Sequence, residues 1–325
     1  MKRLLTMNHS TTKIQDTHEV AGYGHEYWAR AAIRLLSGWV VTTGRRMRWD
    51  LGPRPLIAST LAGVMVLFGA SVAHAKLVAN LLSPAKLSGA KLAASKLSAS
   101  KLAAAELAPN RFAANPRGVS DLMATSDGRE VLSFIVGCAL PEGTTLVAQD
   151  ADNIDHEFFG EIGLTPSWLD RPLNQEGRGW VSACLYARST AASVANPLSL
   201  RGPHPALAVT PEEASTWTLE EGAFYGYYFS PAAQPMMALA CRGRDQAAGE
   251  IGGLINRDCA EPDPLDPTKT QCGFTYAGDC GVFAPTYSCE LFSALGFYET
   301  CHDQPISEDE DSRKFRQVIT VFVLP

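Results

Sequence analysis

A leucine or phenylalanine returns at every fifth residue between residues 77 and 112, and this period restricts what the segment can fold into. The series is Leu77, Leu82, Leu87, Leu92, Leu97, Leu102, Leu107 and Phe112. An α-helix turns about 100° per residue, so a five-residue step rotates by about 140° and scatters the series around the helix. A strand places residues an odd number apart on opposite faces. The short, regular period therefore favours a solenoid.

Most copies of the repeated unit have a small residue, a charged residue and then the leucine. They read AKLVA, NLLSP, AKLSG, AKLAA, SKLSA, SKLAA, AELAP and NRFAA over residues 75–114. This pattern resembles the pentapeptide repeat, and the resemblance implies a short right-handed, four-sided β-helix with the Leu and Phe side chains inside. The small residues that it also places inward are Ala85, Ala90, Ser95, Ser100, Ala105 and Asn110. An Ala-rich helix and a flexible stalk are the alternatives.

Residues 47–75 have the three parts of a secretory signal peptide. They are a basic start (MRWDLGPR), an apolar run (LIASTLAGVMVLFGA) and the small-x-small ending AHA. Cleavage after Ala75 would make Lys76 the first residue of the mature chain. An uncleaved membrane anchor is the alternative, because the apolar run is nearly long enough to span a bilayer.

Residues 1–46 precede this signal, although a signal peptide belongs at the start of a newly made chain. Met47 opens a normal signal peptide by itself. We therefore expect translation to begin there and residues 1–46 to come from a misassigned start. A twin-arginine export signal at Arg45-Arg46 is the rival interpretation, but the residues after it fit that pattern poorly.

Eight cysteines, an even number, all follow the predicted cleavage point. They are Cys138, Cys184, Cys241, Cys259, Cys272, Cys280, Cys289 and Cys301. In an exported chain this pattern predicts up to four disulfides, whose pairing the sequence leaves open. A zinc site is the competing use of cysteine, but the chain has no C-x-x-C pair and no Cys/His cluster at finger spacing.

Charge divides the mature chain into a basic and an acidic segment. Residues 76–115 carry six Lys or Arg and one Glu, whereas residues 116–325 carry 13 Lys or Arg and 29 Asp or Glu. Such an acidic segment is a poor candidate for binding nucleic acid, which requires clustered positive charge. The basic segment could instead fold back onto the acidic one or bind an anionic surface.

The sequence NPRG marks a predicted domain boundary after residue 115, and residues 116–325 suffice for one sizeable domain. Its patterns predict helices at 127–138, near 179–189 and from 210, and strands at 144–149, 156–164, 223–229, 236–242 and 318–324. The stretch 243–312 is rich in Gly, Pro, Asp and Cys and is expected to be mostly irregular. The predicted fold class is α+β: the short four-sided coil, then a mixed α+β domain containing disulfides.

The whole arrangement resembles exported bacterial proteins that join a signal peptide, five-residue repeats and a Cys-containing domain. The phrases that carry this resemblance are VLSFIVGCALPEGT, GEIGLTPSW, WVSACLYAR and SLRGPHPAL. It implies export and brings no particular activity with it.

Few residues suggest chemistry. Only His156, His204 and His302 follow the signal, and the chain has neither H-E-x-x-H nor G-x-S-x-G. No catalytic or cofactor-binding residue is therefore predicted. The acidic run QDADNIDHEFFGE is the best polar cluster, and Asp150, Asp152 and Asp155 are its candidate calcium ligands. A solvent-exposed acidic hairpin turn is the simpler interpretation, because the run lacks the spacing and glycine of an EF-hand loop.

Six aromatic residues could stack on sugars or pack in the core: Trp168, Trp180, Trp217, Tyr225, Tyr227 and Tyr228. The sequence favours an exported, non-enzymatic interaction or cell-envelope protein that is secreted, periplasmic or on the outer cell surface. Its expected partner is a protein or carbohydrate at the cell surface, with no stable membrane span after cleavage. A secreted hydrolase is the alternative, and a pocket with convergent His, carboxylate and Ser or Cys would favour it.

Overall fold

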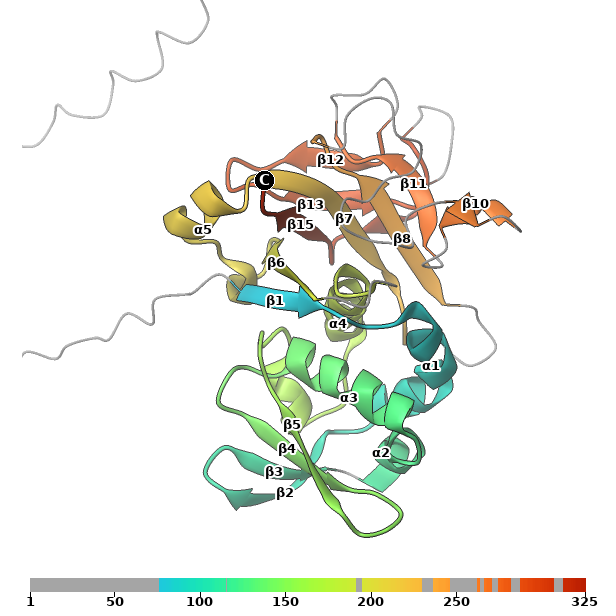
Figure 1. Ribbon diagram of the computed structural model, residues 1–325, viewed down its shortest axis with the longest axis vertical. Helices are drawn as coiled ribbons and strands as arrows, with labels where there is room; N and C mark the ends of the chain where they lie inside the picture. Colours follow the sequence, from blue (N-terminus) through green and yellow to red (C-terminus); the bar gives the residue numbers. More distant parts are fainter. Residues whose placement is uncertain are drawn as a thin grey trace, which may run out of the picture. The chain divides into compact units, whose positions relative to one another are not determined.

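The computed structural model describes residues 76–114, 116–190, 195–229, 236–245, 262–263, 266–270, 274–281, 287–306 and 312–325, which all belong to one compact unit. They form the mixed α+β fold that the sequence predicts (Figure 1). The predicted extension and signal peptide, residues 1–75, lie outside the described residues. None of the described helices has the length and apolar character needed to cross a membrane.

An eight-stranded sheet forms one part of the unit. In spatial order its strands are β1 (Lys76–Asn80), β6 (Asn196–Arg201), β15 (Ile319–Val323), β7 (Leu219–Tyr227), β8 (Met237–Arg242), β11 (Thr275–Asp279), β10 (Asp266–Thr270) and β9 (Pro262–Asp263). Neighbouring strands are antiparallel except β8 and β11. All five residues of β15 are buried, as expected for an apolar, β-branched strand in the middle of a sheet.

Both faces of β7 are covered, and its residues alternate between them. Phe224 and Tyr228 belong to the main core, where helix α4 (Gln175–Ala187) packs on the strand. Tyr225 and Tyr227 face a second core under a three-stranded sheet. The strands of that sheet are β12 (Cys289–Phe292), β13 (Tyr298–His302) and β14 (Lys314–Phe315). The strand predicted at residues 223–229 is thus present, and its side chains alternate between two cores.

A four-stranded sheet and three helices form the other part of the main core. The strands, in order, are β2 (Ala103–Ala108), β3 (Arg111–Ala114), β4 (Thr145–Gln149) and β5 (Asp155–Phe159). The helices are α1 (Pro84–Ser98), α2 (Pro116–Met123) and α3 (Ser126–Ala139). Thr125 caps α3 by accepting a hydrogen bond from the amide of Gly128 at 3.0 Å, so the helix begins slightly before the predicted Asp127.

The remaining helices are short. They are α5 (Pro211–Thr216), η1 (Pro166–Leu169) and η2 (Pro205–Leu207). Thr210 caps α5, the helix predicted from residue 210, because its hydroxyl accepts from the amide of Glu213 at 3.2 Å.

The four-sided coil is the prediction that the structure overturns. Residues 84–98 form an α-helix, and residues 103–114 form the β2–β3 hairpin. The helix buries Leu87, Ala90, Ala94 and Leu97, whose spacings of three, four and three residues define one helical face. Leu92 lies on another side and is 52% exposed. The alanines complete a helical stripe that the leucine period alone conceals.

The repeat segment is also not separate from the residues that follow it. Strand β1 pairs with β6, and β3 pairs in parallel with β4, so the predicted boundary after residue 115 does not divide two domains. Ion pairs of the basic residues Lys86, Lys96 and Arg111 join the basic segment to the acidic one. Lys86 has a further acidic partner, Asp127, so the pairs are Lys86–Asp127, Lys86–Glu130, Lys96–Asp121 and Arg111–Glu157. The basic segment thus folds back onto the acidic one, one of the two arrangements that the charge split suggests.

Three disulfides are present among the described cysteines, and none of these cysteines is free. The bonds are Cys138–Cys184, Cys241–Cys280 and Cys289–Cys301. The first joins α3 to α4, and the other two lie in the core under the three-stranded sheet. Cys259 and Cys272 lie outside the described residues. The prediction of disulfides is therefore confirmed for six of the eight cysteines.

The prediction of an irregular stretch over residues 243–312 is only partly right. The described parts of this stretch include strands β9 to β13. These strands are two to five residues long and interrupted by glycine, proline and cysteine, which weakens the alternation by which strands are recognised.

Candidate functional site

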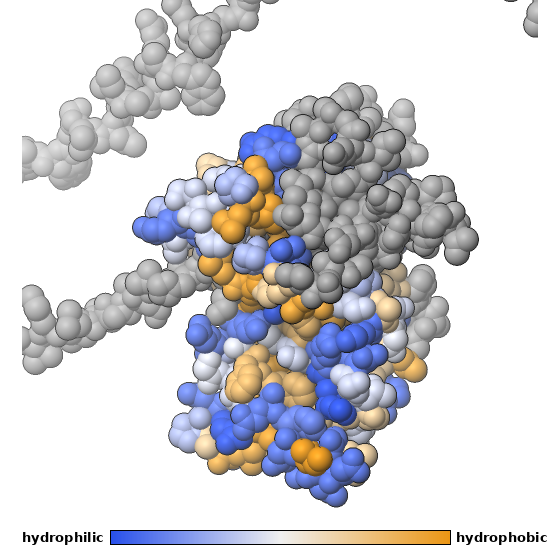
Figure 2. All heavy atoms as spheres, viewed as in Figure 1, coloured by the Kyte–Doolittle hydropathy of each residue, from blue (hydrophilic) through white to orange (hydrophobic). Residues whose placement is uncertain are grey.

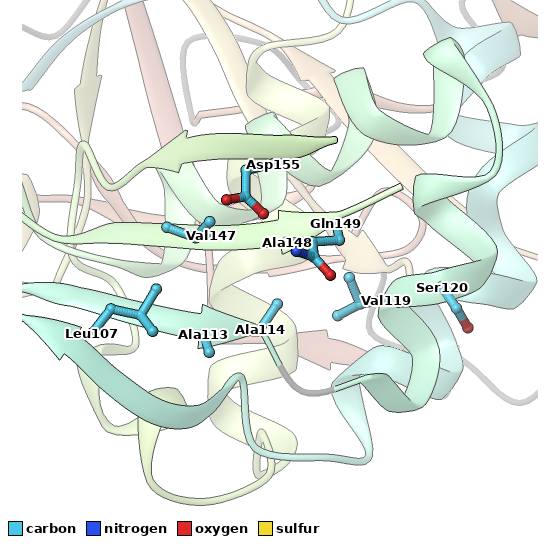
Figure 3. Close-up of a pocket in the computed structure, with 9 residues that line it drawn as sticks. All are labelled: Leu107, Ala113, Ala114, Val119, Ser120, Val147, Ala148, Gln149 and Asp155. Carbon is cyan, nitrogen blue, oxygen red and sulfur yellow. The ribbon is translucent and has the colours of Figure 1, made fainter. Parts of the chain in front are cut away.

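A groove of about 440 Å³ opens beside the four-stranded sheet (Figure 3). Its lining residues are Leu107, Ala113, Ala114, Val119, Ser120, Val147, Ala148, Gln149 and Asp155. They come from all four strands and from the middle of α2. The volume falls in the range of pockets that hold a small molecule or a few side chains of a partner.

Small residues in register create the hollow. Ala113 of β3 lies opposite Ala105 of β2 on one side and Val147 of β4 on the other. Alanine side chains fill little of the space above a pleated sheet, and Leu107 stands at the edge with 57% of its surface exposed. The floor of the groove is therefore apolar and shallow.

Two polar side chains stand at the other side of the groove. Gln149 and Asp155 are opposite each other in the β4–β5 register, and both are exposed. Neither side chain has a hydrogen bond or ion pair with another residue of the described structure. An apolar floor with unpaired polar groups beside it is the usual composition of a binding site.

The predicted calcium ligands have different surroundings. The carboxylate of Asp150 accepts hydrogen bonds from the amides of Asp152 and Ile154, both at 3.0 Å, and contacts His156 Nε2 at 2.8 Å. The hydrogen bond with His156, followed by the bond from the Ile154 amide, lowers the pKa of Asp150. Asp150 thus holds the turn between β4 and β5, while Asp155 lines the groove (Figure 3).

Among the described residues, one group of three side chains lies close enough together to hold a metal ion, and all three are cysteines. Cys241, Cys280 and Cys289 have ligand atoms within 4.8 Å of one another, whereas Asp150, Asp152 and Asp155 form no such group. Disulfides occupy all three of these sulfurs. The acidic run forms the hairpin turn between β4 and β5, and the calcium site at Asp150, Asp152 and Asp155 stays a prediction.

A hydrogen-bonded chain of Ser, His and Glu lies beside the second core. His302 is buried at the end of β13. Its Nδ1 lies 2.5 Å from Ser312 Oγ, and its Nε2 lies 3.0 Å from Glu290 Oε1. Lys314 Nζ contacts the same carboxylate oxygen at 2.6 Å. The hydrogen bonds from Lys314 and His302 lower the pKa of Glu290.

The two disulfides under the three-stranded sheet hold this chain of residues in place. Glu290 and His302 each follow a cysteine, and these cysteines, Cys289 and Cys301, are bonded across β12 and β13. Cys289 Sγ also lies 3.4 Å from Cys241 Sγ, so the second disulfide packs directly against the first. The histidine therefore stands on a covalently linked strand pair.

The other two histidines have structural explanations. His156 contacts Asp150 in the hairpin turn. His204 caps η2, because its Nδ1 accepts from the amide of Ala206 at 3.1 Å, and its ring packs edge-on against Trp180. Burial lowers the pKa of His204. His204 therefore serves the turn in which η2 begins.

A second groove contains a buried arginine. Arg188 lies between β1 and the β4–β5 pair, donates from Nε to the carbonyl of Ala79 at 3.2 Å and pairs with Glu161. Its guanidinium also stacks over the ring of Phe134 at 4.6 Å. All these partners belong to the protein, so Arg188 ties the two sheets together.

The predicted aromatic stacking surface is largely absent from the described residues. Trp168, Trp180, Tyr225 and Tyr228 are buried. Their polar atoms serve the fold: Tyr228 donates to the carbonyl of Leu87 at 2.8 Å, and Trp168 to that of Ser100 at 2.8 Å. These four aromatics pack the core, which is one of the two interpretations that the sequence allows.

Comparison with protein-family models, with curated proteins and with solved structures gives no significant match to this chain.

Sequence reasoning missed both the groove and the Ser–His–Glu chain. Each is assembled by strand register from residues far apart in the sequence. One signal for the second was present, because Glu290 and His302 both follow cysteines and a bond between these cysteines would bring them close.

Proposed function

We propose that this chain is an exported, disulfide-stabilised binding protein whose groove beside the four-stranded sheet receives an extended segment of a partner protein. The observation that carries the proposal is the apolar groove with the unpaired Gln149 and Asp155 at its side. Apolar side chains also lie among the polar ones on the visible face that bears this sheet (Figure 2).

Two features support export. Six of the cysteines form disulfides, which persist in oxidising compartments outside the cytoplasm. Residues 47–75 also have the three parts of a signal peptide, and they precede all eight cysteines.

The chemistry of the groove defines the partner segment. The floor formed by Leu107, Ala113 and Val147 suits an apolar side chain. The free carboxylate of Asp155 suits a lysine or arginine in the same segment. Phe159 of β5 adds exposed apolar surface on the outer strand, with 59% of its area accessible. We therefore expect a segment that combines an apolar residue with a nearby basic one.

Selection of displayed linear peptides on the disulfide-intact protein tests this function. We expect enrichment of peptides that carry an apolar residue close to Lys or Arg. The Leu107→Glu and Asp155→Lys variants should each weaken their binding at least tenfold, because one introduces charge beside the apolar floor and the other repels the basic residue. Dissociation constants from calorimetry provide the measurement.

Matched variants separate the groove from general effects of charge and hydrophobicity. Leu295→Glu changes a leucine that is 66% exposed in the turn between β12 and β13, and Asp152→Lys reverses a charge in the hairpin turn outside the groove lining. Both should bind the peptides like the parent. Equal binding by all four variants, or selection of no peptide, would exclude this function.

The export step predicts a defined mature N-terminus. When the chain is expressed from Met47 in a secreting bacterium, N-terminal sequencing of the released protein should begin at Lys76. The Ala75→Arg variant should stay uncleaved, because signal peptidase requires a small residue before the cut. A released protein that keeps residues 56–70 would contradict cleavage and favour the membrane anchor.

A further inference from the structure

We propose that Ser312 is a nucleophile activated by His302, with Glu290 positioning the histidine, and that this site reacts with carboxylic esters. The site is separate from the groove, which none of these three residues lines. The inference therefore does not depend on the binding function proposed above.

Hydrogen bonding fixes the roles of the two histidine nitrogens. The carboxylate of Glu290 pairs with Lys314 at 2.6 Å and is ionised, so it can only accept. His302 Nε2, 3.0 Å away, must then carry the proton and donate it. In the neutral ring Nδ1 is left with a lone pair, and it accepts from the hydroxyl of Ser312 at 2.5 Å. A serine donating to a histidine that a carboxylate orients is the arrangement of an activated nucleophile.

The surrounding fold holds the base rigid and leaves the serine reachable. The amide of His302 donates to the carbonyl of Ser288 at 2.7 Å, and its own carbonyl accepts from the hydroxyl of Tyr225 at 2.6 Å. The imidazole is buried, whereas Ser312 is partly exposed and lies two residues before Lys314, where β14 begins. Nucleophilic catalysis requires a preorganised base that is hydrogen-bonded to the hydroxyl, and the partly exposed Ser312 and the buried His302 provide this pair.

Ester hydrolysis at this site needs water as its only co-reactant. The Ser312 proton passes to His302 Nδ1 as Oγ bonds to the ester carbonyl carbon. The bond between that carbon and the alkoxy oxygen then breaks, and the imidazolium returns the proton to the departing alcohol. Water attacks the acyl-serine by the same proton route, which releases the acid and restores Ser312.

A fluorophosphonate probe tests the nucleophile directly on the mature, disulfide-intact protein. Ser312 Oγ should bond to phosphorus with loss of hydrogen fluoride, and intact mass and peptide mapping should locate one adduct at Ser312. The Ser312→Ala variant should form none. The His302→Gln variant should react at least a hundredfold more slowly, because it removes the base.

Glu290 variants separate activation from structure. Glu290→Gln preserves the shape and should slow labelling at least tenfold, whereas Glu290→Asp keeps a carboxylate and should restore part of the rate. The side chain at position 290 is partly exposed, so we expect both Glu290 variants to fold. They therefore test the proposal even where His302→Gln does not fold. Urea unfolding confirms which variants are folded.

Hydrolysis of p-nitrophenyl acetate supplies the second measurement. The parent should release p-nitrophenol catalytically, and Ser312→Ala should lose this turnover. Three results would overturn the proposal: no adduct at Ser312 in the parent, an unchanged labelling rate in folded Glu290→Gln, or ester turnover that survives in Ser312→Ala.

Discussion

Replacing Leu97 by Asp is expected to lower the free energy of unfolding by about 4 kcal/mol, whereas the same change at Leu92 should lower it by less than about 1 kcal/mol. Leu97 has no exposed surface on the inner face of α1, so the substitution removes a packed side chain and buries a charge without a partner. Leu92 is 52% exposed on the same helix, and its aspartate would remain in water.

The pair of variants distinguishes the structures that the repeat could form. In a four-sided coil both leucines point inward, so both substitutions would be costly. In a flexible stalk neither would matter. Urea unfolding, followed by circular dichroism, measures the two free energies. Equal losses at Leu92 and Leu97 would contradict the helix.

Several parts of the fold were predictable because their patterns depend on neighbouring residues alone. The cap at Thr210 follows from a threonine before proline and two glutamates. Strand β15 follows from an unbroken apolar, β-branched run. The two-faced strand β7 follows from alternation, with Phe224 on one face and Tyr225 on the other. In each case local chemistry and tertiary environment agree.

The fold of the repeat could not be predicted from its period because it depends on the packing partner. Gly118 of α2 adopts φ 82°, and a Cβ there would lie 2.6 Å from the backbone of Leu97. Only glycine allows this close approach, and small residues of α1, Ala90 and Ala94, are buried in the same core. A pattern of leucines cannot reveal that two alanines belong to the buried face of the helix.

The candidate sites could not be predicted from the sequence for a related reason. Asp155 is recognisable in the sequence as one acidic residue among several, but only the β4–β5 register places it beside Gln149 at an apolar groove. Likewise Ser312, His302 and Glu290 are joined by strand pairing and a disulfide rather than by a motif. Spacing along the chain carries no information on such contacts until the pairing is known.

Removing the disulfide Cys138–Cys184 by a double substitution to Ala is expected to lower the free energy of unfolding by about 4 kcal/mol. The bond closes a segment of 46 residues between α3 and α4 in the main core. A crosslink restricts the unfolded chain more strongly as the closed loop lengthens. Both sulfurs are fully buried, so loss of the bond also loosens the contact between the two helices.

The double variant Cys289→Ala/Cys301→Ala is the matched control. Its bond closes only 12 residues within one strand pair, so its removal should cost about 3 kcal/mol, roughly 1 kcal/mol less than the longer loop. Urea unfolding of each variant under non-reducing conditions gives both values. If the short loop proved the more stabilising of the two, restriction of the unfolded chain would not be the main source of stability, and the close packing of Cys289 against Cys241 would become the better explanation.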